Sequence, residues 1–371
     1  MRTGYENGAR IAKGTHIAKI AKIARAAALA GATFLAMGVP ALQAAARAVG
    51  AAHDPASFAA SAMPADTPAL LQTAQRQFNA GNYSAAITTL QSAITQNPSS
   101  GEAYYWLGRT YYEIHDYDNA IAAGEKSVAL DPKNSVYHQW LGRIYGGKAD
   151  RDRSFSYARK VKKEFEAAVE LNPDNVAARR DLEEYDLQAP WVVGGNKDEG
   201  KAEVEAITLR DPVAGHLARG VYDTEGAKKA DLAEKEYREV LDAKPAKIEP
   251  YLEVIAFFQQ QNKPADMETA IEAAALVAPN DPRLGYWRGA ALTLANSNLA
   301  DAEKYLKAYL ASTSDRSDWP SHAAARVWLG RVYEAQGKRS EAAEQYRAAL
   351  QLDSSDKDAK TRLEKLAKSA H

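Results

Sequence analysis

Small and apolar residues recur at helical spacing in three separate segments of the chain. Each set has an Ala, a larger apolar or aromatic residue four positions later, and a small residue three positions after that. The sets are Ala86, Leu90 and Ala93; Ala342, Tyr346 and Ala349; and the looser Ala233, Tyr237 and Val240. Because residues three and four apart share one face of an α-helix, each set predicts a helix that buries one face.

A second motif, Leu-Gly-x-x-Tyr, occurs three times and predicts the helix that packs against such a face. Its copies begin at Leu107, Leu141 and Leu329. The glycine of each copy lets a second helix approach closely, because only a hydrogen stands where a side chain would be. The tyrosine of each copy is expected to fill the space between one helix pair and the next. These tyrosines are Tyr111, Tyr145 and Tyr333.

Proline recurs where the second helix of each pair is expected to end, since proline cannot continue a helix. The positions are Pro98, Pro132, Pro173, Pro212, Pro245 and Pro279, and Ser314 and Ser354 take the same place later. Successive spacings are 34, 41, 39, 33, 34, 35 and 40 residues. A base period of 34 with a few insertions predicts one array of stacked helix pairs, rather than the two or three domains that 371 residues would suggest.

These motifs, in phase with the period, resemble the tetratricopeptide repeat (TPR) family over about residues 67–355, with about eight repeats. The resemblance implies an all-α fold, a TPR α-solenoid in which antiparallel helix pairs form a right-handed superhelix. Residues 356–371 are expected to form a capping helix and tail. Insertions are expected near residues 146–156, 189–199 and 313–321. The sequence departs from the family at Trp106, Trp140 and Trp328, which stand directly before the motif Leu instead of three residues earlier.

The first 46 residues have the composition of a secretory signal peptide. Six basic residues and one acidic residue precede an uncharged run over residues 26–46, and Ala44, Ala46 and Ala48 offer cleavage sites. The alternatives are an uncleaved membrane anchor, which would be the one membrane contact of the chain, and an organelle transit peptide. Export, to the periplasm or out of the cell, is the favoured interpretation. Residues 47–66, rich in Ala, Pro and Ser, are expected to be a flexible linker.

Charge and cysteine content exclude several classes of function. The chain has 47 basic and 48 acidic residues, and without the leader its formal charge falls from −1 to about −6. A negative body argues against nucleic acid as the partner. The absence of cysteine excludes disulfides, Cys-based zinc sites, iron–sulfur clusters and a thiol nucleophile.

One Gly-rich stretch suggests catalysis but lacks essential parts of a nucleotide site. Gly195, Gly200 and Lys201 have the spacing of a phosphate-binding loop. Ala202 stands where a Ser or Thr would bind magnesium, and two carboxylates lie between the glycines. We therefore expect a loop that enters a helix. The seven histidines are scattered without metal-ligand spacing, so we expect no enzyme, no cofactor and no metal.

The resemblance to TPR proteins also implies a binding site, because the first helix of each pair lines a concave groove in that family. The expected groove residues are Tyr105, Arg109, Tyr112, Glu113, Gln139, Arg143 and Arg331, with Tyr286 and Arg180 added if their repeat frames hold. The three arginines at the same repeat position, Arg109, Arg143 and Arg331, suit a carboxylate or an acidic peptide. In the alternative interpretation, each arginine pairs with a Glu or Asp of the adjacent repeat.

Two further stretches have open interpretations. Residues 148–163 hold seven basic and two acidic residues, which suit either an anionic partner or a solvated stretch leading into a helix. Residues 190–193 are apolar and lie in an expected insertion. We expect Trp191 and its neighbours to plug the superhelix, with a partner-binding tip as the alternative.

These observations favour a non-catalytic exported TPR scaffold that binds a protein or peptide in its concave groove. The alternative is a periplasmic small-ligand carrier or transport accessory, in which the Trp191 loop closes a cavity. An open groove lined by aromatic residues and arginines would favour the scaffold, and an enclosed apolar pocket would favour the carrier.

Overall fold

The computed structural model describes residues 67–312 and 315–368. Within these residues it contains seventeen α-helices, two short helical turns and no strand, so the predicted all-α fold is confirmed. The expected leader and linker lie outside the described residues. The helices are α2 (Thr67–Asn79), α3 (Tyr83–Gln96), α4 (Gly101–Glu113), α5 (Tyr117–Leu130), α6 (Ser135–Asp152), α7 (Phe155–Leu171), α8 (Val176–Gln188), α9 (Lys197–Thr208), α10 (Pro212–Val221), α11 (Ala230–Asp242), α12 (Glu249–Gln260), α13 (Pro264–Val277), α14 (Arg283–Leu294), α15 (Leu299–Ser312), α16 (His322–Ala335), α17 (Arg339–Leu352) and α18 (Lys357–Lys368). The turns are η2 (Trp191–Val193) and η3 (Tyr222–Gly226).

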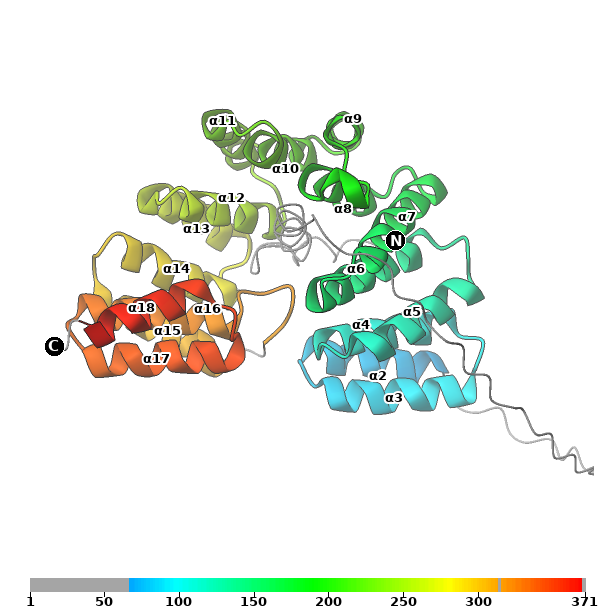
Figure 1. The fold of residues 1–371 in the computed structure, drawn as a ribbon, viewed down its shortest axis with the longest axis horizontal. Coiled ribbons are helices and arrows are strands. Elements are labelled where there is room, and N and C mark those ends of the chain that lie inside the picture. The colour runs from blue at the N-terminus through cyan, green and yellow to red at the C-terminus, as the bar shows by residue number, and fades with distance from the viewer. Residues whose placement is uncertain (1–66, 313–314, 369–371) are drawn as a thin grey trace, which may run out of the picture.

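Helices α2 to α17 form eight consecutive pairs in the described part of the chain, and α18 packs on the last pair. Each pair packs on the pair that follows it. The pairs follow one another along an arch, so that the first pairs and the last pairs lie at its two ends (Figure 1). The predicted α-solenoid of about eight repeats with a terminal helix is confirmed.

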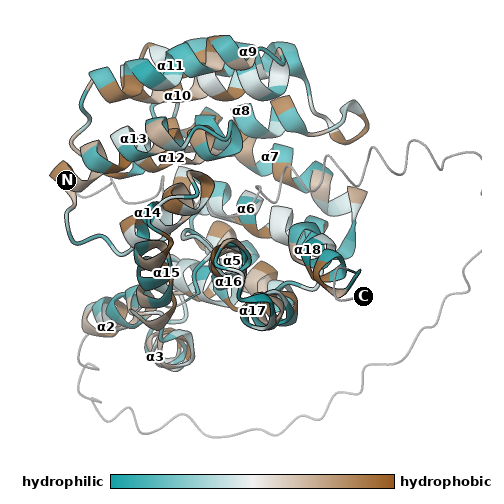
Figure 2. Cartoon of the chain, turned by 90° about the vertical axis from the view of Figure 1, so that its left-hand side faces the viewer, coloured by the Kyte–Doolittle hydropathy of each residue, from teal (hydrophilic) through white to brown (hydrophobic). Residues whose placement is uncertain are grey.

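The second helix of each pair buries one narrow stripe. Helix α3 buries Ala86, Leu90 and Ala93, which is one of the sets that the sequence pattern singles out, and α17 and α11 bury the other two sets. The remaining faces are polar, and the helices accordingly carry hydrophilic and hydrophobic stripes side by side (Figure 2). Stacking of these stripes gives a continuous core, because no single pair can bury its own apolar face.

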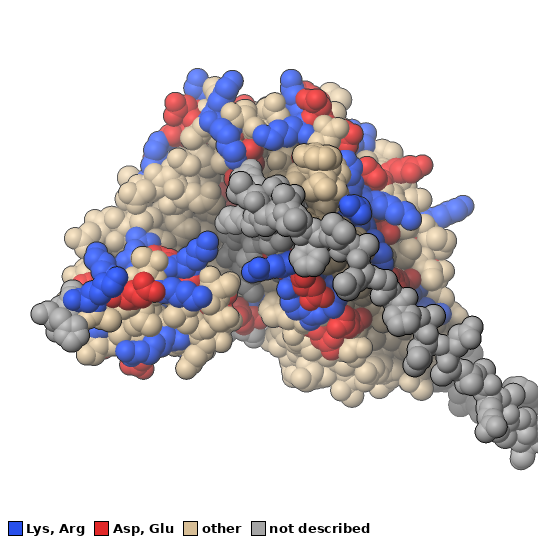
Figure 3. Space-filling model, viewed as in Figure 1, with Lys and Arg blue, Asp and Glu red and all other residues tan. Residues whose placement is uncertain are grey.

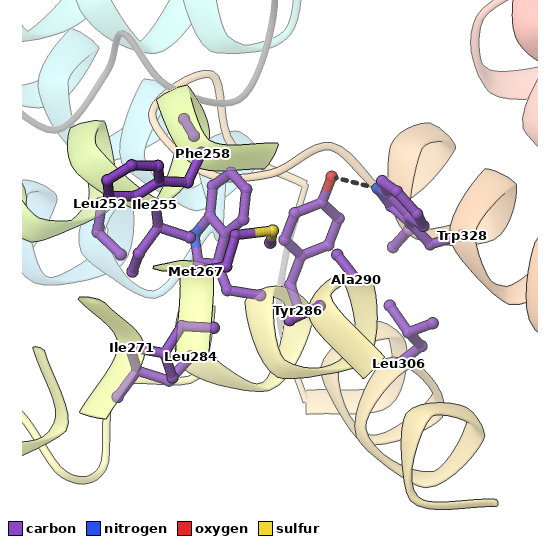
Figure 4. Packing of buried hydrophobic residues seen from close by; sticks show 14 of the residues in the cluster. Leu252, Ile255, Phe258, Met267, Ile271, Leu284, Tyr286, Ala290, Leu306 and Trp328 are labelled. Carbon is purple, nitrogen blue, oxygen red and sulfur yellow. Dashed lines mark hydrogen bonds between the residues drawn. The ribbon is translucent and has the colours of Figure 1, made fainter. Parts of the chain in front are cut away.

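The largest core cluster extends through the second half of the array. Phe258 of α12, Met267 and Ile271 of α13, and Leu284 and Trp287 of α14 are almost completely buried there. Figure 4 shows these layers meeting, with side chains from three successive helices interleaved. Burial of this kind is the main stabilising contribution available to a solenoid.

The motif glycines lie at the closest approach within a pair, as predicted. A Cβ added to Gly142 would stand 2.5 Å from the Phe165 ring of α7, and one added to Gly330 would stand 2.5 Å from the Tyr346 ring of α17. Both distances are well below van der Waals contact. Only glycine therefore lets these helices pack at their observed separation.

The motif tyrosines join each pair to the pair before it. The hydroxyl of Tyr145 donates to Glu125 of α5 at 2.6 Å, and that of Tyr333 donates to Glu303 of α15 at 3.2 Å. The hydroxyl of Tyr111 accepts from Gln91 of α3 at 3.4 Å. The expected position between successive repeats is confirmed for all three tyrosines.

The turn inside each pair contains a residue with positive φ. Gly81 and Gly337 provide it in the first and last pairs, where a residue without Cβ adopts this conformation at no steric cost. Asn262 and Asn296 provide it in the sixth and seventh pairs, and asparagine is the next most tolerant residue. The first, sixth, seventh and eighth pairs thus use a turn with the same backbone feature, although its sequence varies.

One local prediction is wrong. Pro212 does not end a helix, because α9 has already ended at Thr208 and Pro212 is the first residue of α10. The first N–H of a helix has no partner within it, so a proline, which lacks this N–H, fits at that position. The expected insertion near residues 146–156 lies within helices, because α6 and α7 have lengthened to 18 and 17 residues. By contrast, the expected insertion near 189–199 does form a loop, which contains η2.

Alanine substitution at two glycines of α6 tests the close-packing argument. Gly142→Ala should lower the melting temperature, because overpacking against Phe165 costs about 1–3 kcal/mol. Gly146→Ala, one turn later, is the control: its Cβ would meet Val161 at an ordinary 3.9 Å, and the gain in helix propensity is up to about 1 kcal/mol. Thermal unfolding followed by circular dichroism measures both. Equal shifts in the two variants would contradict the argument.

Candidate partner-binding face

The first helices of the pairs form the inner side of the arch. Among the described helices, each first helix from α2 to α14 contacts the first helix of the next pair (α4, α6, α8, α10, α12, α14 and α16 in turn), and no second helix makes substantial contact with the next second helix. Helices at the smaller radius of a curved stack are the ones that touch, so the first helices are on the concave side, as Figure 1 also shows. We call this side the inner face.

Arg109 of α4 lies among aromatic side chains of the first three pairs. Its guanidinium lies 4.1 Å from the ring centroid of Trp140 on α6 and 4.4 Å from that of Trp106 on its own helix. It also donates to the hydroxyl of Tyr105 at 2.9 Å. Tyr112, one turn later, packs edge-on against Trp140 and is buried. This group joins α4 to α6 by cation–π and aromatic contacts.

Gln139 and Arg143 of α6 converge on one carboxylate of the next pair. The Asp181 Oδ2 atom of α8 accepts from Gln139 at 2.6 Å and from Arg143 Nε at 2.9 Å. The side chains of Arg143 and Asp181 are only 13% and 6% exposed. The alternative interpretation, in which the arginine pairs with an acid of the adjacent repeat, is confirmed for Arg143.

Further side chains continue these links along the inner face. Arg180 of α8 pairs with Glu253 of α12 at 2.8 Å, passing α10, and donates to the backbone of that helix at Ala214. The Trp328 indole of α16 donates to the Tyr286 hydroxyl of α14 at 3.1 Å (Figure 4). Arg180 and Tyr286, the two conditional groove residues, therefore both connect helices of different pairs.

Glu113 contacts a segment far away in the sequence. Its carboxylate accepts from the Ser317 backbone N–H at 2.8 Å and from the Ser317 hydroxyl at 2.6 Å. Burial raises the pKa of Glu113, and the hydrogen bonds from Ser317 act in the opposite direction. No pattern in the sequence relates these two residues, which stand 204 positions apart.

Arg331 differs from the other two arginines at its repeat position. It lies 4.0 Å from the ring centroid of Trp328 on its own helix, and within residues 67–312 and 315–368 it forms no ion pair or hydrogen bond. The neighbouring helix α18 presents Arg362, which already pairs with Glu334 and Asp358. Burial lowers the pKa of Arg331, and the charge of Arg362 acts in the same direction.

The structure thus distributes the seven predicted groove residues among four environments. Tyr105, Arg109 and Tyr112 belong to the aromatic group between α4 and α6, and Gln139 and Arg143 bind Asp181. Glu113 binds Ser317. Arg331 alone stands at the C-terminal end of the inner face with a partly exposed guanidinium and a second arginine beside it. Asp181 and Ser317 have no sequence signal of their own, because neither belongs to a repeated motif.

The Trp191 loop does not plug the superhelix. The side chain of Trp191 is 85% exposed, whereas Val193 is buried at 1% exposure in the core cluster that includes Ala158 of α7 and Tyr185 of α8. Val193 is held there because its carbonyl accepts from the Tyr185 hydroxyl at 2.8 Å. The plug prediction is wrong because the tight η2 turn can direct only one of its apolar residues inward.

The basic stretch 148–163 is largely neutralised by neighbouring acids. Lys148 pairs with Asp118 and Asp152, and Lys162 pairs with Asp186 at 2.9 Å. The stretch lies on α6 and α7 and not in a loop. These ion pairs favour the interpretation of a solvated pair of helices over that of an anion-binding segment.

The Gly-rich stretch is a loop that enters helix α9, as expected. Helix α9 begins at Lys197, and Gly195 packs so closely on the Ala189 carbonyl that a Cβ there would overlap it. No group of three or more acidic or histidine side chains is arranged to hold a metal within the described residues. In that same part of the chain, no helix has both the length and the apolar character needed to cross a membrane.

Comparison with known proteins agrees with the motifs. Residues 71–135 and 293–357 match the family model described as tetratricopeptide repeat. Among solved structures, the chain is similar to a thermophilic TPR protein of Thermus thermophilus at 21% identity and a TM-score of 0.43, over 52% of this chain and 99% of that one. It is also similar to a tetratricopeptide repeat protein of Parabacteroides merdae, at 13% identity and a TM-score of 0.42, over 81% and 98% of the two chains.

A third similar structure is the APC/C hetero-tetramer Cut9-Hcn1, at 12% identity and a TM-score of 0.47. That match covers 80% of this chain and 55% of the other. No curated protein sequence matches the chain.

Proposed function

We propose that this chain, which carries tetratricopeptide repeats, is a non-catalytic exported scaffold that binds a protein or peptide partner on its inner face. The TPR fold is itself consistent with a role in protein–protein interaction. The observation that supports the site most directly is Arg331. Its counterparts Arg109 and Arg143 are engaged by the next pair, whereas Arg331 faces a second arginine.

The surroundings of Arg331 suit a carboxylate. The planar guanidinium rests on the Trp328 ring, which fixes its orientation and leaves its edge able to bind two oxygen atoms. Lys and Arg side chains gather over the adjacent helix α18 (Figure 3), which has five basic and two acidic residues. An acidic partner group would relieve the repulsion between Arg331 and Arg362 and be attracted by α18.

The carrier hypothesis has less support. It requires the Trp191 loop to close a cavity, and Trp191 is directed into solvent instead. The inner face near Arg109 and Arg143 is occupied by cation–π contacts and ion pairs, which are poor surroundings for an apolar small ligand. The scaffold function therefore fits the described residues better.

Charge reversal at Arg331 tests the proposed contact. The chain without its first 46 residues serves as bait, and captured proteins are quantified by mass spectrometry. Arg331→Glu should reduce the capture of the specific partner at least about tenfold, because a favourable charge pair becomes a repulsive one. Arg347→Glu, on the exposed face of the outer helix α17, is the matched control and should leave capture unchanged.

Retention of every captured protein by the Arg331→Glu variant would disprove the assignment. Reversal of Arg109 or Arg143 is a poor test, because both side chains hold neighbouring pairs together. Their substitution would disturb the array whether or not a partner binds there.

Export of the chain is supported by the composition of residues 1–46: a basic start, an uncharged apolar run and small residues at the end. Cell fractionation with N-terminal sequencing tests it. We expect a mature protein outside the cytoplasm that begins within a few residues of Ala44–Ala48. Full-length protein in the cytosol, with residues 1–44 intact, would contradict export.

A further inference from the structure

The segment between α15 and α16 reaches from one end of the arch to the other. It includes residues 315–321, which we call the clasp loop. In Figure 1 this connection extends from the last pairs toward α4. The contact is unusual for a solenoid, in which each repeat normally touches only its neighbours.

The first half of the clasp loop binds the C-terminal ends of two helices at the start of the array. Arg316 Nη1 donates to the Asn79 carbonyl, the last of α2, at 3.1 Å. Ser317 donates twice to Glu113, the last residue of α4. A helix C-terminus carries unpaired carbonyls and partial negative charge, so the Arg316 cation suits the end of α2, whereas Ser317 binds the Glu113 carboxylate itself.

Aromatic and acidic side chains hold Arg316 in position. Its guanidinium lies between the Phe78 ring of α2, at 5.9 Å, and the Trp319 ring of its own loop, at 5.3 Å. Asp318 binds it in a bidentate manner, with both distances 2.8 Å. The side chain of Arg316 is 15% exposed, so the contact is partly shielded from water.

The second half of the clasp loop is anchored in the last pairs. Trp319 packs against the large core cluster of the second half and beneath Arg283 of α14. The Pro320 carbonyl accepts from the buried Tyr309 hydroxyl of α15 at 2.6 Å. The loop is therefore fixed at one end of the arch and reaches the other end with Arg316 and Ser317.

Packing between helices does not close the arch. Within the described residues, every two elements in substantial contact belong to one helix pair, to two successive pairs, or to the last pair and α18. The hydrogen bonds of Arg316 and Ser317 span 237 and 204 residues, and they bridge the otherwise separate ends.

We infer that the clasp loop is a conformational latch that holds the first and last pairs together and sets the opening of the inner face. With the latch closed, a partner reaches the inner face along the axis of the arch. With the latch open, the arch widens and admits a partner through the gap between its ends. This inference depends on the geometry of the loop and stands whether or not Arg331 binds a partner.

Distance measurements between spin labels test the latch. The chain has no cysteine, so Ser92→Cys on α3 and Ser340→Cys on α17 give two unique exposed labelling sites at the two ends. Pulsed electron–electron double resonance should give a single narrow distance distribution for the labelled chain. Glu113→Ala and Arg316→Ala should each shift the mean to longer distance and broaden the distribution.

Glu102→Ala is the matched control, because Glu102 is an exposed acid on the same helix α4 and does not contact the clasp loop. It should leave the distribution unchanged. Circular dichroism should report the same helix content in all variants. Arg316 lies in a loop, so its substitution changes no helical residue. Unchanged distances in both Glu113→Ala and Arg316→Ala would overturn the inference, since the stiffness of the stack would then hold the ends.

Discussion

The structure depends on the stacking of one helix pair against the next. A single pair has a narrow apolar stripe and cannot bury it alone, so each pair is stable only with its neighbours. The motif residues meet this constraint in two ways. Gly142 and Gly330 let the helices of a pair approach closely, and Tyr145 and Tyr333 bind an acid of the preceding pair. The terminal helix α18 ends the stack: it packs on the last pair through Ala359, its one fully buried residue, and its outer face is mostly polar.

The inner face shows how one repeat position acquires different roles. Arg109 meets Trp140 of the next pair, and Arg143 meets Asp181. At Arg331 the next helix is α18, whose Arg362 lowers the pKa of Arg331, while Asp358 of the same helix acts in the opposite direction but pairs with Arg362 and not with Arg331. The arginines that stiffen the array and the one we assign to a partner are thus distinguished by the neighbouring helix, not by their own motif.

The fold could be predicted from the sequence because its evidence is local and repeated. The Leu-Gly-x-x-Tyr copies and the Ala-based stripes lie within single helices, and their period gives the number of pairs. The prediction that Pro212 ends a helix was wrong because a proline fits both just after a helix and at the first position of the next one. The prediction that Trp191 plugs the superhelix was wrong because composition alone cannot tell which residue of an apolar turn faces inward.

The candidate site was harder to predict, because its contacts join distant segments. Asp181 and Ser317 lie outside the motifs, and the sequence cannot show that a loop before the last pair returns to the C-termini of α2 and α4. Such closure follows from the curvature accumulated over the whole stack, to which every pair contributes a small rotation.

Hydrogen–deuterium exchange of the chain without its first 46 residues, alone and with its captured partner, tests the proposed inner-face site most directly. We expect slower exchange on binding in α16 and α18, around Arg331 and Arg362. Protection confined to the outer helices, such as α5, α7 and α9, with α16 and α18 unchanged, would contradict it.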